Sequence, residues 1–370
     1  MAEKLSEIIA HLESIAPLSM QESFDNSGLI VGNRNQMVNK ALISLDCTED
    51  VVHEAIENQC DLIISHHPIV FGGLKRLTGS NYVERTVELA IKNGIALYAI
   101  HTNLDNVLHS GVNAKIAEKI GLKQSAILSP KKGKLLKLQV FTPIDFVEIV
   151  SEALFQAGAG RIGNYSECSF QGSGLGTFKP MSGANPFTGT QGVRSREEEV
   201  RLEVLIPEHA VSRVLGAMKQ AHPYEEVAYD LIRLENDWQE VGSGLVGYLA
   251  EEMSVDEFLA HVKQSMELPM IKFTPLTSPD KKIKKVAICG GSGSFLTKVA
   301  LAKGCDAYIT ADVKYHEFFD AEKQLLLCDI GHFESEKYTI DLISEILSKK
   351  FRTFATIFAQ SITNPVQYFI

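Results

Sequence analysis

The sequence predicts an α/β protein with a duplicated α/β core, into which a ferredoxin-like βαββαβ domain is inserted. Short apolar segments alternate with amphipathic helical segments between residues 41 and 100, the pattern of βαβ units with a largely parallel sheet. The same pattern returns later, because residues 286–306 align with residues 41–61 at an offset of 245. Between these copies, residues 138–143 and 202–207 repeat each other at an offset of 64.

The composition is that of a folded cytoplasmic protein. With 370 residues the chain is long enough for two or three domains, and 45% hydrophobic residues argue against disorder. The 36 basic and 46 acidic residues give a net charge of −10, which argues against general binding of nucleic acid or anionic membranes. The amino terminus predicts an amphipathic helix rather than a signal peptide, and no apolar run approaches membrane-spanning length.

The cysteines indicate a reducing compartment. Six are scattered without C-x-x-C spacing, so we expect small reduced core residues and no disulfide framework. They are Cys47, Cys60, Cys168, Cys289, Cys305 and Cys328.

The first half of the core begins with that helix, followed by a turn-rich loop over residues 22–28. Asp25 and Asn26 in this loop fit an ordinary turn as well as a site role. The elements expected next are strand 41–45, helix 50–59, strand 61–65, helix 83–92 and strand 95–100.

The strand at 61–65 ends in two adjacent histidines. His66 and His67 precede Pro68, which cannot donate to a sheet ladder and therefore stops the strand. The histidines are thus placed at the carboxyl end of a strand, where open α/β sheets bind their ligands. Alone, the pair is more typical of surface histidines than of a site. Other strand ends decide between the two interpretations.

Two further strands end in groups that bind metals. The strand at 95–100 runs into His101-Thr-Asn-Leu-Asp105. This segment is either a helix cap or a second group of residues in the same site as His66 and His67. The strand at 324–330 runs into Gly331, and a helix then begins near His332. Glu336 lies four residues beyond His332, so both side chains share a helix face. Three such strand ends predict one metal site.

The inserted segment begins with a linker at residues 129–134. Each of its two copies reads as strand, helix and strand, and two copies make a ferredoxin-like unit. Its middle, residues 171–194, carries six glycines and predicts a mobile loop that binds ligands or partners. Residues 222–226 are interpreted as a structural turn.

The second half of the core differs from the first at its strand ends. The positions of His66 and His67 are taken by Ala311 and Asp312. The loop Cys289–Ser294 could cradle an anion at a helix amino terminus, but it lacks the third glycine of G-x-G-x-x-G. No dinucleotide-binding fold is therefore predicted.

These segments together resemble the NIF-three-like family, also called GTP cyclohydrolase 1 type 2 homologues. The resemblance covers the whole chain and implies three parts: a first core half at 1–128, an inserted PII/CutA-like domain at 129–241 and a second core half at 242–370. It also implies a two-metal centre and ring-shaped hexamers. Its motifs are Ser65–Pro68, His101–Asp105, Gly290–Gly293, Asp312–His316 and Gly331–Glu336. The metal ligands it implies are His66, His67, Asp105, His332 and Glu336.

Three imidazoles and two carboxylates suit two divalent ions. Zinc is the first expectation, with iron, manganese, cobalt or nickel as alternatives. Such a centre is typical of hydrolases, and either Asp105 or Glu336 is expected to bridge the ions. The outer residues expected to orient groups or move protons are His101, Asp312, Lys314 and His316.

Two functions are compatible with these residues. The first is a two-metal hydrolase that acts on a small molecule, with a nucleotide such as GTP suggested by the family name. The second is a metal-loaded scaffold or regulator, in which the inserted domain senses a small molecule and the hexamer binds a partner protein.

Overall fold

The computed structural model describes residues 2–278 and 280–369, which form two compact units. One unit consists of the residues up to 130 together with those from 240 onward, and the other consists of residues 131–239. All six cysteines are free. Within the described ranges, every helix is too short or too polar to cross a membrane.

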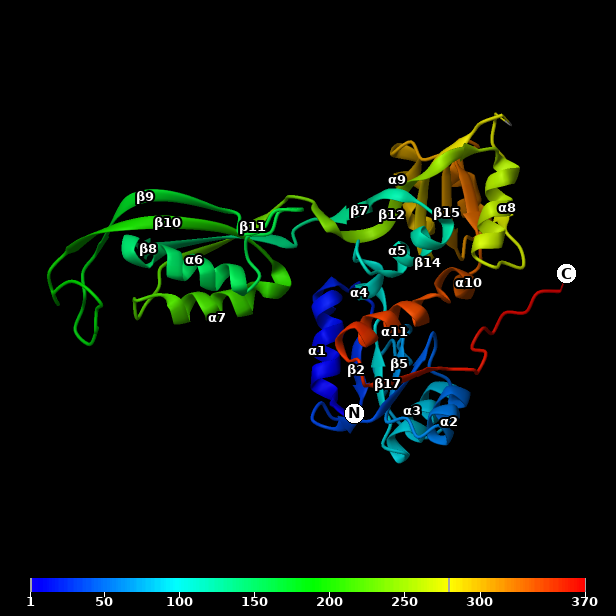
Figure 1. The fold of residues 1–370 in the computed structure, drawn as a ribbon, viewed down its shortest axis with the longest axis horizontal. Helices are drawn as coiled ribbons and strands as arrows, with labels where there is room; N and C mark the ends of the chain where they lie inside the picture. Colours follow the sequence, from blue (N-terminus) through cyan, green and yellow to red (C-terminus); the bar gives the residue numbers. More distant parts are fainter. Residues whose placement is uncertain (1, 279, 370) are drawn as a thin grey trace. The chain divides into compact units, whose positions relative to one another are not determined.

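The first sheet of the larger unit has five strands in the order β17-β4-β5-β6-β2 (Figure 1). β4 (Lys40–Ser44), β5 (Leu62–Ser65) and β6 (Ala96–Ala99) run parallel to one another. β17 (Ala355–Phe358) pairs parallel with β4, and β2 (Gly28–Val31) pairs antiparallel with β6. The predicted parallel α/β half is therefore confirmed.

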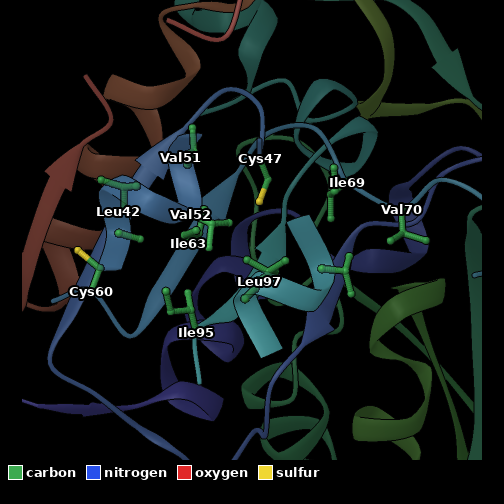
Figure 2. Packing of buried hydrophobic residues seen from close by; sticks show 13 residues of the cluster. Leu42, Cys47, Val51, Val52, Cys60, Ile63, Ile69, Val70, Ile95 and Leu97 are labelled. Atoms are coloured by element: carbon green, nitrogen blue, oxygen red, sulfur yellow. The ribbon is translucent and has the colours of Figure 1, made fainter. Parts of the chain in front are cut away.

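Helices α2 (Glu49–Glu57) and α3 (Tyr82–Lys92) share a buried core with this sheet. Figure 2 shows side chains of the strands and of α2 in this core. They include Leu42, Ile63, Leu97, Val51 and Val52. Helix α1 (Leu5–Ile15) packs against α11 (Thr339–Lys350), which also contacts β4.

The second sheet has six strands in the order β13-β16-β15-β14-β12-β7. β14 (Ile283–Ser292), β15 (Ala307–Ala311) and β16 (Leu326–Asp329) are parallel. β14, α9 (Thr297–Ala302) and β15 follow one another as β4, α2 and β5 do, which agrees with the duplication read from the sequence. The antiparallel strands are β13 (Lys272–Phe273) on β16 and β12 (Trp238–Met253) on β14.

Further elements of this unit are the edge strand β7 of the second sheet, two short strands and two helices. Helices α5 and α8 contact each other, and α5 also contacts β14. These elements are β1 (Glu3–Lys4), β3 (Met37–Val38), α5 (Val112–Ile120), β7 (Lys123–Lys131) and α8 (Val255–Ser265).

The second half of the chain also contributes to the first sheet, which the division at residue 242 did not anticipate. After β16 the chain returns through α11, and β17 then pairs with β4. A central parallel strand needs hydrogen-bond partners on both sides, and β17 supplies the missing side of β4. The two halves of the core are thus joined through a shared sheet.

Residues 131–239 form a four-stranded antiparallel sheet in the order β11-β8-β10-β9. The elements follow as strand, helix, strand, strand, helix and strand, the order expected from the repeat. They are β8 (Leu135–Pro143), α6 (Val147–Gln156), β9 (Ser169–Phe178), β10 (Ser195–Pro207), α7 (Val211–Ala221) and β11 (Tyr229–Leu234). Both helices lie on one face of the sheet (Figure 1), over a core that includes Leu138, Leu202 and Val214.

The glycine-rich segment 171–194 is only partly a loop, so the prediction for it was wrong in its first third. Gly172, Gly174 and Gly176 lie in β9, which is an edge strand paired with β10. Glycine is tolerated there because the ladder hydrogen bonds come from the backbone and an edge strand needs little side-chain packing. Residues 179–194 do form an irregular connection between the two strands.

The path of the chain between the units leads to a prediction about residues 131–239. β7 and β12 are neighbours in the second sheet, and a Cβ on Gly242 would collide with Ser129 and Pro130. The chain therefore leaves and re-enters the core at adjacent points. We predict that a chain with residues 131–239 replaced by a short Gly-Ser linker still folds and binds metal. Circular dichroism and elemental analysis measure this, and an insoluble or metal-free core would contradict it.

Candidate metal centre

The carboxyl ends of strands from both sheets deliver the side chains of one cluster. β5 leads directly into His66 and His67, and β6 leads through His101 into the short helix α4 (Thr102–Asp105). In the second sheet, β16 leads into helix α10 (His332–Glu336). The five side chains expected as metal ligands lie together, in groups whose ligand atoms are within 4.8 Å of one another.

Glu336 is the centre of the cluster. Its Oε2 lies 3.0 Å from Nε2 of His67 and 3.1 Å from Nε2 of His332. Its Oε1 lies 3.8 Å from Nε2 of His66, and that nitrogen is 3.6 Å from Oδ1 of Asp105. Glu336 therefore belongs to two groups of three, one with His67 and His332 and the other with His66 and Asp105.

The three imidazoles are all oriented in the same way. Each donates its Nδ1–H to an oxygen outside the cluster: His66 to Ile100 O at 2.8 Å, His67 to Asp46 Oδ1 at 2.7 Å and His332 to Asp312 Oδ2 at 2.6 Å. Every Nε2 is consequently directed at the cluster. An outer acceptor of this kind fixes the tautomer and ring orientation of histidines that bind metals.

Two atoms of the cluster lack a hydrogen-bond partner although they are buried, Nε2 of His66 and Oδ1 of Asp105. Buried polar atoms without a partner are costly and rare in proteins. A cation between these atoms would satisfy both of them. The donor set, three imidazoles and two carboxylates, is also one that divalent transition metals bind. The residues present therefore fit a metal centre.

The pKa values show how strongly the cluster favours cations. Burial opposes protonation of His67, yet hydrogen bonds to Asp46 and Glu336 raise its pKa to about 10. Burial is likewise outweighed at His332, where hydrogen bonds to Glu336 and Asp312 raise the pKa to about 9. Burial and the charge of Glu336 raise the pKa of Asp105 to about 8. Without metal ions, protons thus compensate the carboxylates.

Glu336 itself stays ionised. Burial would raise its pKa, but hydrogen bonds from the surrounding imidazoles hold the pKa well below the usual range for a glutamate. A buried carboxylate that remains charged is a strong ligand for a divalent cation.

Asp46 and Asp25 are site residues that the sequence did not single out as ligand partners. Asp46 lies just beyond β4, binds His67 and accepts a hydrogen bond from Thr363. Asp25, which fitted a turn equally well, accepts a hydrogen bond from Nδ1 of His101 at 2.8 Å. Burial opposes its ionisation, but hydrogen bonds from His101 and Thr102 hold its pKa well below the usual range.

Of the four outer residues expected from the sequence, the structure brings two to the cluster. His101 lies with its ring centroid 5.2 Å from that of His66 and 5.3 Å from that of His67. Asp312 orients His332. Lys314 and His316 are exposed at the start of the 3₁₀ helix Tyr315–Ala321, and neither lines the cavity over the cluster.

Two residues beside His332, its partner Asp312 and Gly331, have a positive φ. Asp312 has φ of +55°, a left-handed conformation that few residues with a side chain adopt. Gly331 has φ of +90°, and a Cβ there would collide with the carboxylate of Glu334. These conformations direct Asp312 toward His332 and let α10 begin immediately after β16.

Two backbone amides of the glycine loop after Cys289 are already engaged. The amide of Gly290 donates to Asn113 and the amide of Gly291 donates to Ser335, so neither is available to a ligand. Gly291 instead leaves room for the side chain of Glu336. It has φ of +61°, and a Cβ on Gly291 would collide with Oε1 of Glu336.

A cavity of about 1060 Å³ opens over the cluster. Its lining includes His67, Asp105, His332 and Glu336, together with residues from the loops of both halves of the core. Thr363 and other residues of the segment after β17 also line it. The cluster is therefore accessible to a small molecule, as a catalytic site requires.

The family follows from a match over almost the whole chain. Residues 3–365 match Duf34/NIF3 (NGG1p interacting factor 3). The chain belongs to the Duf34/NIF3 family. This confirms the family expected from the motifs.

Proteins of several bacteria are similar to the chain over more than 90% of its length. A "GTP cyclohydrolase 1 type 2 homolog" of Halalkalibacterium halodurans is 41% identical over 344 residues, 92% of this chain and 91% of that protein. One of Bacillus subtilis is 38% identical over 368 residues, 98% of both chains. The solved structure of a Bacillus cereus protein related to NIF3 is 39% identical and has a TM-score of 0.85 over 99% of both chains.

The packing of Gly291 against Glu336 leads to a prediction. Gly291→Ala should lower metal affinity roughly 10–100-fold, because the added methyl group displaces the shared carboxylate. Gly304→Ala is the matched control: Gly304 has a similar φ of +65° but open space around it, so this variant carries the backbone strain alone. Metal titration of both variants measures the difference. Equal affinities would show that Gly291 does not position Glu336.

Proposed function

We propose that this protein is a metal-dependent hydrolase with a two-metal centre held by His66, His67, Asp105, His332 and Glu336. The observation that carries the proposal is the position of Glu336. One oxygen faces His67 and His332 and the other faces the pair of His66 and Asp105, so one carboxylate can bridge two ions. The sequence left Asp105 and Glu336 as equal candidates for the bridge.

Zinc is the first choice of metal, and iron, manganese, cobalt or nickel would suit the same ligands. When bound, such ions supply a Lewis acid and a water of lowered pKa. Five protein ligands do not saturate two ions, so positions remain for water and substrate. This is the condition that separates a catalytic site from a structural one.

The surrounding residues have distinct roles in this proposal. Asp46 and Asp312 hold His67 and His332 in the tautomer that leaves Nε2 free for a metal. His101 lines the cavity and donates its Nδ1–H to buried Asp25, so its Nε2 can take a proton from water or give one to a leaving group. Since Lys314 and His316 lie away from the cluster, we assign them no role.

The substrate of this hydrolase is a small molecule. The name of the relatives, GTP cyclohydrolase 1 type 2 homolog, makes a nucleotide one candidate. The sequence also left open a metal-loaded scaffold or regulator, and the strand order β11-β8-β10-β9 supports a ferredoxin-like, PII/CutA-like sensing domain at 129–241. We also propose that the chain forms a homohexamer and acts in the cytoplasm. Bound metal without turnover would favour the regulator.

The decisive experiment compares ligand variants. We predict that His67→Ala, Asp105→Asn and Glu336→Gln each lower metal content and hydrolysis of a nucleotide and nucleoside panel together. A second substitution should add little, because residues that act as one unit are strongly non-additive. Metal per chain comes from elemental analysis, and turnover is measured with and without added metal. His109→Ala, which alters an exposed histidine, is the control. Full occupancy in a single variant would remove that residue from the site.

Metal binding should also depend on pH. In the metal-free protein the pKa values of His67 and His332 are raised to about 10 and about 9, so both imidazoles carry protons at neutral pH. These protons must leave when a metal binds, so affinity falls as pH falls, about tenfold per pH unit for each proton released. Calorimetric titration in buffers of different ionisation enthalpy counts the protons. Binding that releases none would contradict the protonated cluster.

A further inference from the structure

We propose that the cavity over the metal centre selects planar ring compounds that carry no phosphate group and are uncharged or positively charged. This inference rests on the proposed function, because the ring must reach the metal ligands to be a substrate. It argues against the nucleotide that the relatives' name suggests, since GTP combines a planar base with a triphosphate, and it favours the compounds of the proposed panel that lack phosphate.

The charge of the lining is the first argument. Seven carboxylates line the cavity, and among the described residues Lys272 is the single lysine or arginine that does so. With all of these ionised and the imidazoles neutral, the lining carries a net charge of −6, and two divalent ions would leave −2. A polyanion is repelled by such a cavity. The carboxylates belong to Glu22, Asp46, Asp105, Asp312, Asp329, Glu334 and Glu336.

The one lysine is already paired. Nζ of Lys272 lies 2.6 Å from Oδ2 of Asp329, whose side chain is 1% exposed. Asp329 also accepts hydrogen bonds from the backbone amides of Val313 and Gly331. Moving Lys272 to a phosphate would leave a buried carboxylate without its cation, which is strongly unfavourable.

The amino termini of α2 and α3 do not replace the missing basic side chains. Helices α2 and α3 begin beside the cavity, where Thr48 and Tyr82 line it, and helix amino termini can bind phosphate. In α2, however, Thr48 caps the helix and Glu49 and Asp50 occupy its first turn. In α3, Asn81 caps the helix and Glu84 occupies the first turn. These acidic residues already use the positive end of each helix dipole.

The second argument is the aromatic part of the lining. Phe24, Phe71, Tyr82 and Phe295 line the cavity although each is more than half exposed. The ring centroid of Phe71 lies 5.6 Å from that of His101, which is itself 5.3 Å from that of His67. An aromatic surface therefore reaches the edge of the metal centre. A planar ring would cover such side chains by stacking, and a cationic ring would be attracted further by their π faces.

A matched pair of chelators tests the charge selection directly. 8-Hydroxyquinoline is a planar ring that binds zinc, and 8-hydroxyquinoline-5-sulfonate is the same ring with one added negative charge. We expect the parent compound to remove zinc from the zinc-loaded full chain about tenfold faster or more, after correction for the zinc affinity of each chelator in solution. The rates come from chelate absorbance, with elemental analysis of the recovered protein.

Variants separate charge from ring stacking. Glu334→Gln and Glu22→Gln should each bring the two rates severalfold closer, whereas Glu251→Gln, an exposed change on β12 outside the lining, should not alter their ratio. Phe71→Ala should slow both chelators and leave their ratio unchanged. Unaltered rates in Phe71→Ala would overturn the stacking part of the inference.

The outcomes distinguish this inference from the function on which it rests. Zinc loss at equal rates, or faster loss with the sulfonate, would overturn the charge selection and leave the metal centre intact. A chain that retains no zinc would overturn the metal centre and this inference with it.

Discussion

The larger unit depends on one buried negative charge, the carboxylate of Glu336, which is 3% exposed. A charge in this position is tolerated only if its surroundings supply compensating charge and hydrogen bonds. His67 from the first sheet and His332 from its own helix both contact the same carboxylate oxygen. The compensation therefore comes from both halves of the core, and it joins the carboxyl ends of the two sheets at a single point.

The arrangement around this point is layered. Glu336 and the imidazole Nε2 atoms form the inner layer, and Asp46, Asp312 and the carbonyl of Ile100 hold the rings from outside. Residues of a third layer hold those of the second in place. For example, the hydroxyl of Thr363 donates a hydrogen bond to Asp46. Because each layer has few alternative partners, the donors are positioned before a cation arrives. Preorganisation of this kind lowers the cost of binding.

The sequence predicted the α/β class and a site at three strand ends from short segments. The duplication came from comparing segments 245 residues apart, and the set of five ligands came from the family resemblance. An apolar run that stops at His66, or a histidine four residues before Glu336, is visible within ten letters. The role of Asp46 was not visible, since one aspartate after a strand is common and its contact with His67 follows from the order of β4 and β5. The role of Gly291 depends on Glu336, far along the chain, and was likewise hidden.

One wrong prediction and one feature that the sequence did not show have a related origin. The glycines of β9 suggested a loop because glycine is rare in strands, but an edge strand paired with a long neighbour tolerates it. The return of the chain to the first sheet was not visible in the sequence, because the four residues of β17 carry no signal of the strand that they join. In both cases, strand pairing between segments that are distant in the sequence determined the structure.

The return of β17 to β4 has a consequence for the order in which the protein is made. While the chain emerges from the ribosome, the first sheet is complete from β4 to β2 long before α10, α11 and β17 have been synthesised. During that interval β4 is an unprotected edge, and His66 and His67 face no Glu336. The edge of β4 therefore stays unpaired until β17 has been made, and His66 and His67 meet Glu336 only after the strands of the second sheet have been synthesised.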